Sequence, residues 1–175
     1  MQSADILQTI AEISIGFAGF TSVVAVLGRR ATGEWTALDR FRLSQMLATS
    51  LAALLLSLLP LILAHLGLSE RVSWGLASTI LAAYTIFLAI SSPRRIRRLP
   101  PEDQSQIVRP LLWSFQLAVA AVVTGLLINA AGILFHQEPG PYLLGLYLLL
   151  ALSAFQFTRL LLIVRAEGSS GTGGA

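Results

Sequence analysis

Hydrophobic residues in this chain form five long blocks separated by short polar segments. The blocks cover residues 4–28, 38–66, 72–92, 110–136 and 142–165. A helix rises about 1.5 Å per residue and the bilayer core is about 30 Å thick, so a spanning helix needs about 20 residues. Each block reaches that length. The pattern therefore predicts an all-α, polytopic membrane protein, with a bundle of five transmembrane helices in a single domain over residues 1–166.

Glycine, proline and arginine mark the limits of these blocks. Gly28 is followed by an arginine pair and ends the first block, since glycine stops a helix and arginine anchors it at the interface. Pro60 lies inside the second block and predicts a kink. Ser69 is the expected N-cap of the third helix, which we expect to stop at Pro93. Residues 167–175 are rich in glycine and serine and predict a flexible tail.

Composition agrees with membrane insertion and excludes several functions. Hydrophobic residues make up 55% of the 175 residues and charged residues 12%, and the mean hydropathy is +0.74. The absence of cysteine excludes disulfides and thiolate metal sites. The net charge of +3 does not indicate nucleic-acid binding, because the arginines flank apolar helices instead of forming a basic face with stacking aromatics.

The distribution of arginine predicts the orientation of the chain. Eleven of the twelve basic residues, all arginine, fall on one side of the predicted topology, and Arg71 falls on the other. The positive-inside rule then places the arginine-rich loops and the C-terminus in the cytoplasm and the N-terminus outside. We expect a multi-pass protein of the cell membrane, in a bacterium the inner membrane.

Arginines near the inner surface form a predicted basic belt. Asp39 is expected to cap the second helix, and nearby arginines can meet headgroup phosphates. Anionic lipids are therefore the expected partners of six residues: Arg40, Arg42, Arg94, Arg95, Arg97 and Arg98.

Signatures of catalysis are absent from the sequence. It contains no Gly-x-Ser-x-Gly, P-loop, His-Glu-x-x-His or dinucleotide-binding glycine pattern. His65 and His136 lie near the outer ends of their helices and could approach each other, but a metal or haem site needs further supporting groups. We therefore expect no enzyme activity, no metal and no cofactor.

Glu12 is the one acidic residue well inside a predicted span, where an ionisable group is costly and is a candidate for function. It shares a helix face with Gln8, Gly16 and Gly19. The carboxylate could bind a cation, carry a proton, or accept hydrogen bonds in a structural role.

The first helix also carries two phenylalanines beside its glycines. If this helix lines a central axis, Phe17 or Phe20 could form a hydrophobic constriction that gates a narrow pore. The alternative is that the glycines serve close helix packing.

Polar and small residues also follow one face of the second and fourth predicted helices. Their depth predicts an outer polar layer in which Glu12 meets Asn129 or Ser57, within one subunit or across an interface. A second layer near the inner boundary contains Gln45, Gln116, Gln156 and Arg159. Arg159 could snorkel to the interface or face an aqueous cavity that selects anions. The alternative reading is that these faces hold the bundle together.

Three functions are compatible with these features. The leading hypothesis is a homo-oligomeric ion channel or transporter-like protein, because the chain has little mass outside the membrane. The second is a structural or accessory subunit that binds a partner or anionic lipid. The third is an intramembrane enzyme that uses Glu12 and His136.

Overall fold

The computed structural model describes residues 2–32, 36–105, 109–133 and 137–170. It confirms the predicted all-α fold, with five helices that are long and apolar enough to cross a membrane. The protein is therefore a multi-pass membrane protein. The long helices are α1 (Gln2–Thr32), α2 (Ala37–His65), α3 (Glu70–Ile96), α5 (Arg109–Ala130) and α6 (Pro139–Ser170), and a short helix α4 (Pro101–Ser105) lies between α3 and α5.

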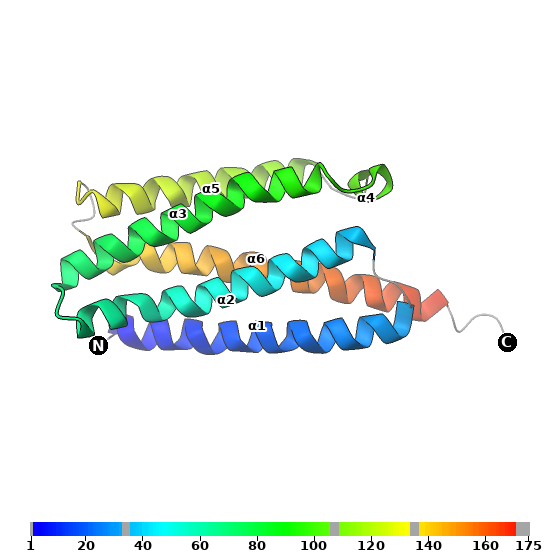
Figure 1. Ribbon diagram of the computed structural model, residues 1–175, viewed down its shortest axis with the longest axis horizontal. Coiled ribbons are helices and arrows are strands. Elements are labelled where there is room, and N and C mark those ends of the chain that lie inside the picture. The colour runs from blue at the N-terminus through cyan, green and yellow to red at the C-terminus, as the bar shows by residue number, and fades with distance from the viewer. Residues whose placement is uncertain (1, 33–35, 106–108, 134–136, 171–175) are drawn as a thin grey trace.

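The long helices run in alternating directions along one bundle axis (Figure 1). Helices α3 and α5 form one layer, and α1, α2 and α6 form the other. We call the end that contains α4, the start of α2 and the end of α3 the arginine-rich end. The chain begins at the other end, the N-terminal end (Figure 1).

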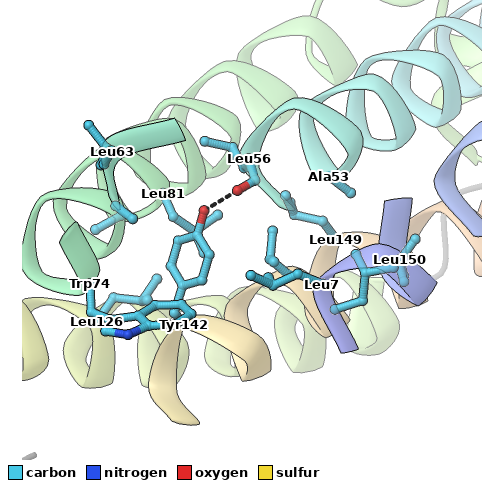
Figure 2. Packing of buried hydrophobic residues seen from close by; sticks show 14 of the residues in the cluster. Leu7, Ala53, Leu56, Leu63, Trp74, Leu81, Leu126, Tyr142, Leu149 and Leu150 are labelled. Carbon is cyan, nitrogen blue, oxygen red and sulfur yellow. Dashed lines mark hydrogen bonds between the residues drawn. The ribbon is translucent and has the colours of Figure 1, made fainter. Parts of the chain in front are cut away.

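The main hydrophobic core lies toward the N-terminal end. Leucines from α1, α2, α3, α5 and α6 surround Trp74 and Tyr142 (Figure 2). The two aromatic rings pack edge to face, with centroids 5.8 Å apart. A smaller cluster of Val24, Met46 and Leu160 joins α1, α2 and α6 toward the arginine-rich end. Close packing is therefore most extensive in the half that contains the chain start.

Pro60 removes a hydrogen bond inside α2, and another helix replaces it. Proline has no N–H, so the carbonyl of Leu56, four residues earlier, loses its helical donor. The hydroxyl of Tyr142 on α6 donates to that carbonyl (Figure 2). Tyr142 is fully buried at 0% exposure. The backbone group left open by the proline is thus satisfied inside the bundle, as a membrane interior requires.

Pro93 also frees a carbonyl that another helix satisfies. The expectation that this proline ends the third helix is wrong. Helix α3 continues through Pro93 to Ile96. The carbonyl that this proline leaves without a helical donor belongs to Ala89. The side chain of Gln116 on α5 donates to it at 3.3 Å. A donor from a neighbouring helix therefore accompanies each of these two prolines.

Further buried polar side chains join the same two helix pairs, α2 with α6 and α3 with α5. Thr49 and Ser50 of α2 meet Ser153 of α6, at 2.7 Å and 3.2 Å between hydroxyl oxygens. Asn129 of α5 donates to Ser78 of α3 at 3.0 Å. The polar faces of α2 and α5 thus point into the bundle, and their hydroxyl and amide groups bond to neighbouring helices.

The helix ends differ from the sequence expectation in five details. Helix α1 continues through Gly28 to Thr32, so the expectation that this glycine stops it is wrong. Helix α5 ends at Ala130, before the predicted limit at residue 136. Thr36, and not Asp39, is the N-cap of α2, and its hydroxyl oxygen accepts from the backbone N–H of Asp39 at 3.1 Å. Ser69 occupies the N-cap of α3 without a capping hydrogen bond from its side chain. Helix α6 continues to Ser170, into the segment expected to be a flexible tail.

Candidate functional site

The polar face of α1 points away from the bundle. Gln8 and Glu12 are exposed, and the amide of Gln8 donates to the Glu12 carboxylate at 3.0 Å. Glu12 lies nine residues beyond the start of the apolar segment at Ser3, a depth of roughly 13 Å along the helix. A carboxylate is therefore held at membrane depth on the outside of a single chain.

Gly16 and Gly19 continue this face toward the arginine-rich end. A Cβ atom added at either glycine would meet nothing within 4 Å. The glycines therefore do not serve packing within one chain. We call the exposed residues Gln8, Glu12, Gly16 and Gly19 the α1 face.

The two phenylalanines of α1 point in different directions relative to the α1 face. Phe17 is turned inward and packs edge to face against Phe157 of α6, with ring centroids 6.1 Å apart. Phe20 is 57% exposed, and its ring centroid is 5.8 Å from that of Phe157. Phe20 therefore flanks the α1 face, whereas Phe17 belongs to the bundle. Of the two residues predicted as alternative constrictions, Phe20 is therefore the one exposed on the outside of a single chain.

Within one chain, Glu12 does not meet Asn129 or Ser57 as expected. Asn129 is fully buried, and it bonds Ser78 and the backbone of Glu138. The Ser57 hydroxyl donates to the carbonyl of Leu54 in its own helix. Asn129 is also only one residue from the end of its apolar segment at Ala130, whereas Glu12 lies nine residues inside its own segment. Helices α2 and α5 turn these polar residues inward, and α1 turns Glu12 outward.

Apolar side chains border the α1 face on both sides. Ile13 is 45% exposed and Ile15 is 57% exposed. Helix α5 also has a broad exposed face, but its large residues there are apolar, with Trp113 and Leu117 more than 70% exposed. The α5 face suits lipid. The α1 face combines a carboxylate, an amide and bare glycines between isoleucines, which lipid tails cannot satisfy.

A cavity of about 140 Å³ lies in the arginine-rich half of the bundle. Helices α2, α3, α5 and α6 form its walls, and none of the α1 side chains that the structure describes lines it. The polar lining comprises Arg42, Gln45, Ser92, Gln116, Gln156 and Arg159. The four residues expected to form an inner polar layer, Gln45, Gln116, Gln156 and Arg159, therefore meet around one cavity.

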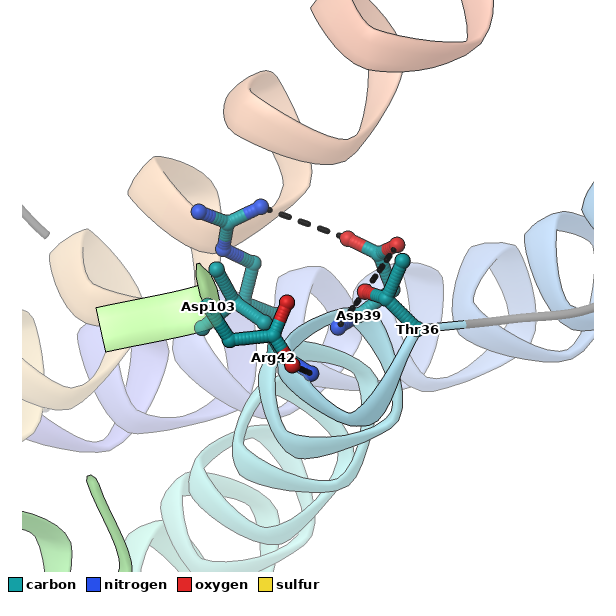
Figure 3. A network of polar contacts seen from close by, with 5 residues as sticks. Thr36, Asp39, Arg42 and Asp103 are labelled. Carbon is teal, nitrogen blue, oxygen red and sulfur yellow. Dashed lines mark hydrogen bonds and ion pairs between the residues drawn. The ribbon is translucent and has the colours of Figure 1, made fainter. Parts of the chain in front are cut away.

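Arg42 departs from its expected place in the surface belt. It is only 3% exposed. Its guanidinium contacts the carboxylate of Asp39 at 3.3 Å, within the network at the start of α2 (Figure 3). The nearby carboxylate of Asp103 is also buried and accepts from the backbone N–H of Leu38 at 3.2 Å. The spacing of three residues between Asp39 and Arg42 could have predicted this ion pair from the sequence. Asp103 is distant in the sequence, so no local pattern predicts that it lies near Arg42.

The other arginines of the predicted belt lie on the surface. All are exposed near the ends of α2 and α3: Arg40, Arg94, Arg95, Arg97 and Arg98. This position suits contact with headgroup phosphates.

The structure describes one of the two histidines. His65 is exposed, with Nδ1 2.8 Å from the carbonyl oxygen of Leu61 in its own helix. His136 lies outside the residues that the structure describes. Among those residues, no group of three or more histidine, cysteine or acidic side chains could hold a metal ion.

Comparison of the chain with protein-family models, with curated proteins and with solved structures found no match.

Proposed function

We propose that this protein is a homo-oligomeric ion channel or transporter-like protein in which the α1 faces of several copies meet around a shared axis. The observation that carries the proposal is the outward direction of Glu12. The bundle buries the polar faces of α2 and α5 but leaves this carboxylate and Gln8 outside. The proposal places the arginine-rich end in the cytoplasm and the N-terminus outside, following the positive-inside rule.

The properties of the α1 face support contact with other copies. Charged or strongly polar groups in a span are costly against lipid and normally face a protein partner or water. Gly16 and Gly19 offer open space for the close approach of another backbone. Ile13 and Ile15 border the polar residues and can seal them from lipid. One face thus offers both an apolar contact surface and a polar strip.

The chemistry of Glu12 suits a cation or a proton as the transported species. Around a shared axis, several carboxylates would create a negative site in the half of the membrane near the N-terminal end. Gln8 holds each carboxylate through a hydrogen bond of 3.0 Å. Phe20 lies beside the face and can narrow the path.

Cysteine cross-linking tests the contact between α1 faces. The chain has no cysteine, so Gly16→Cys introduces a unique thiol on the α1 face. We expect oxidation in the membrane to produce disulfide-linked dimers of Gly16→Cys or Gly19→Cys, because a disulfide needs Cα atoms within about 7 Å. The matched control is Leu117→Cys on the apolar face of α5, which is 74% exposed. Dimers at Leu117 in place of the glycines would contradict the proposal.

Ion flux tests the role of the carboxylate. In liposomes we expect the wild-type protein to carry protons or monovalent cations, and Glu12→Gln to reduce the rate by about tenfold or more, because the amide cannot bind a cation or proton in the same way. The control Glu138→Gln makes the same chemical change on an exposed residue outside the spans. It is expected to leave flux unchanged.

Flux and cross-linking together separate this proposal from the second function. An accessory subunit that covers its α1 face with a different protein would show no flux and no cross-linking between copies. Cross-linking with no flux would support homo-oligomerisation alone and contradict the channel. Equal flux from wild type and Glu12→Gln would contradict the role of the carboxylate.

A further inference from the structure

The cavity in the arginine-rich half is separate from the α1 face and has its own chemistry. Its walls come from α2, α3, α5 and α6. Leucine and phenylalanine side chains make up much of the wall, and two arginines reach it from different helices. A pocket with apolar walls and a few convergent polar groups is the usual form of a small-molecule site.

The two arginines leave the cavity with positive charge. Arg42 is offset by Asp39, which it contacts at 3.3 Å, and by the nearby charge of Asp103. Arg159 packs over the ring of Phe155, 5.7 Å from its centroid, and it makes no ion pair with a carboxylate in the described part of the chain. The positive charges of Arg159 and Arg42 repel each other. An anion between them would relieve this repulsion.

Two of the three glutamines that line the cavity already make hydrogen bonds to neighbouring helices. Gln45 donates to Ser92 at 3.0 Å, and Gln116 donates to the carbonyl of Ala89 at 3.3 Å. These two side chains are thus engaged in holding helices together. Arg159 and its neighbour on α6, Gln156, remain as the groups best placed to contact a ligand.

The volume limits what can enter. The cavity measures about 140 Å³. A water molecule needs roughly 10–15 Å³ of such space, so there is room for on the order of ten waters, or for a phosphate group with part of an apolar chain. A guanidinium group binds phosphate through two parallel N–H bonds, which an ammonium cannot do.

We propose that this cavity binds the phosphate group of an anionic ligand, with Arg159 as the main contact, Arg42 as the second charge and the phenylalanines against the apolar part. Two sources can supply that group, an anionic phospholipid or a soluble phosphate compound. The proposal does not depend on the α1 face, because none of the residues of that face lines the cavity.

Two binding measurements on the full-length protein distinguish the sources. In the first, inorganic phosphate is titrated calorimetrically into protein in nanodiscs of phosphatidylcholine. In the second, purified protein is exchanged into mixed phosphatidylglycerol and phosphatidylcholine, and the retained anionic lipid is quantified by mass spectrometry. Binding in the first measurement identifies a soluble phosphate, and selective retention in the second identifies a lipid.

Variants connect either result to the cavity. We expect Arg159→Gln to weaken binding by about tenfold or more, since a charge-assisted bidentate contact is lost. Arg159→Lys retains the charge without the planar fork, so its affinity should lie between that of the wild type and that of Arg159→Gln. Arg94→Gln removes an exposed arginine outside the cavity and should bind as wild type. Ala89→Leu fills part of the cavity from α3 while leaving both arginines in place, and should abolish binding by exclusion.

The results that overturn the proposal are equally specific. Equal binding by Arg159→Gln and Arg94→Gln in both measurements would assign the anion to the surface arginines. No binding of phosphate or retention of phosphatidylglycerol by the wild-type protein would remove the site. If Arg159→Gln does not fold, full binding by Ala89→Leu overturns the proposal, and loss of binding by Ala89→Leu supports it.

Discussion

Tyr142→Phe is expected to destabilise the bundle by about 1–3 kcal/mol, the usual cost of leaving a buried polar group without its partner. The variant keeps the aromatic ring and its packing against Trp74. It removes only the hydroxyl that donates to the Leu56 carbonyl. That carbonyl has no helical donor because Pro60 lacks an N–H. Unfolding by sodium dodecyl sulfate in mixed micelles, followed by circular dichroism, measures the change.

A double-mutant cycle with Pro60→Ala isolates this cause. Alanine restores an N–H that can bond the Leu56 carbonyl inside α2. We therefore expect Tyr142→Phe to cost less in the Pro60→Ala background than in the wild type, with a coupling energy between about 0.5 and 3 kcal/mol. Equal costs in the two backgrounds would show that the hydroxyl stabilises the protein for a different reason.

Gly145→Ala is expected to have an effect of similar size through steric overlap. A Cβ atom at this position would lie 2.7 Å from the Cδ2 atom of Leu81 and 3.2 Å from a methyl carbon of Leu126. Both leucines are fully buried in the main core cluster, so their methyl groups would have to shift inside the packed core. Overpacking of this kind costs about 1–3 kcal/mol. The same unfolding assay measures it.

Gly125→Ala is the matched control on α5. A Cβ atom there would meet nothing within 4 Å. Since alanine is favoured over glycine inside a helix by roughly 0.5–1 kcal/mol, this variant should be neutral or slightly stabilising. If both glycine variants destabilise equally, backbone flexibility and not space at Gly145 governs the result.

The sequence predicted the spanning helices because the signal for them is local. Twenty or so apolar residues in a row meet the thickness of a bilayer without reference to any other part of the chain. The effect of Pro93 was wrongly predicted because it depends on a residue elsewhere in the chain. Whether a helix continues through a proline depends on what can satisfy the freed carbonyl, and the donor, Gln116, is on another helix.

The candidate sites show the same limit. The spacing of Gln8, Glu12, Gly16 and Gly19 correctly placed them on one helix face, but spacing does not say whether that face points inward or outward. Arg42 was assigned to the surface because it is one of several arginines near a helix start. It is buried beside Asp39, which it contacts, and near the charge of the distant Asp103, and the second of these has no local signal.

The link between Leu56 and Tyr142 also has a consequence for biosynthesis. The two residues are 86 positions apart, so at about 5–20 residues per second the hydroxyl is made roughly 4 to 17 s after the carbonyl that it serves. Membrane helices insert before they associate. During that interval α2 must hold an open carbonyl at membrane depth, and only the arrival of the final span closes it.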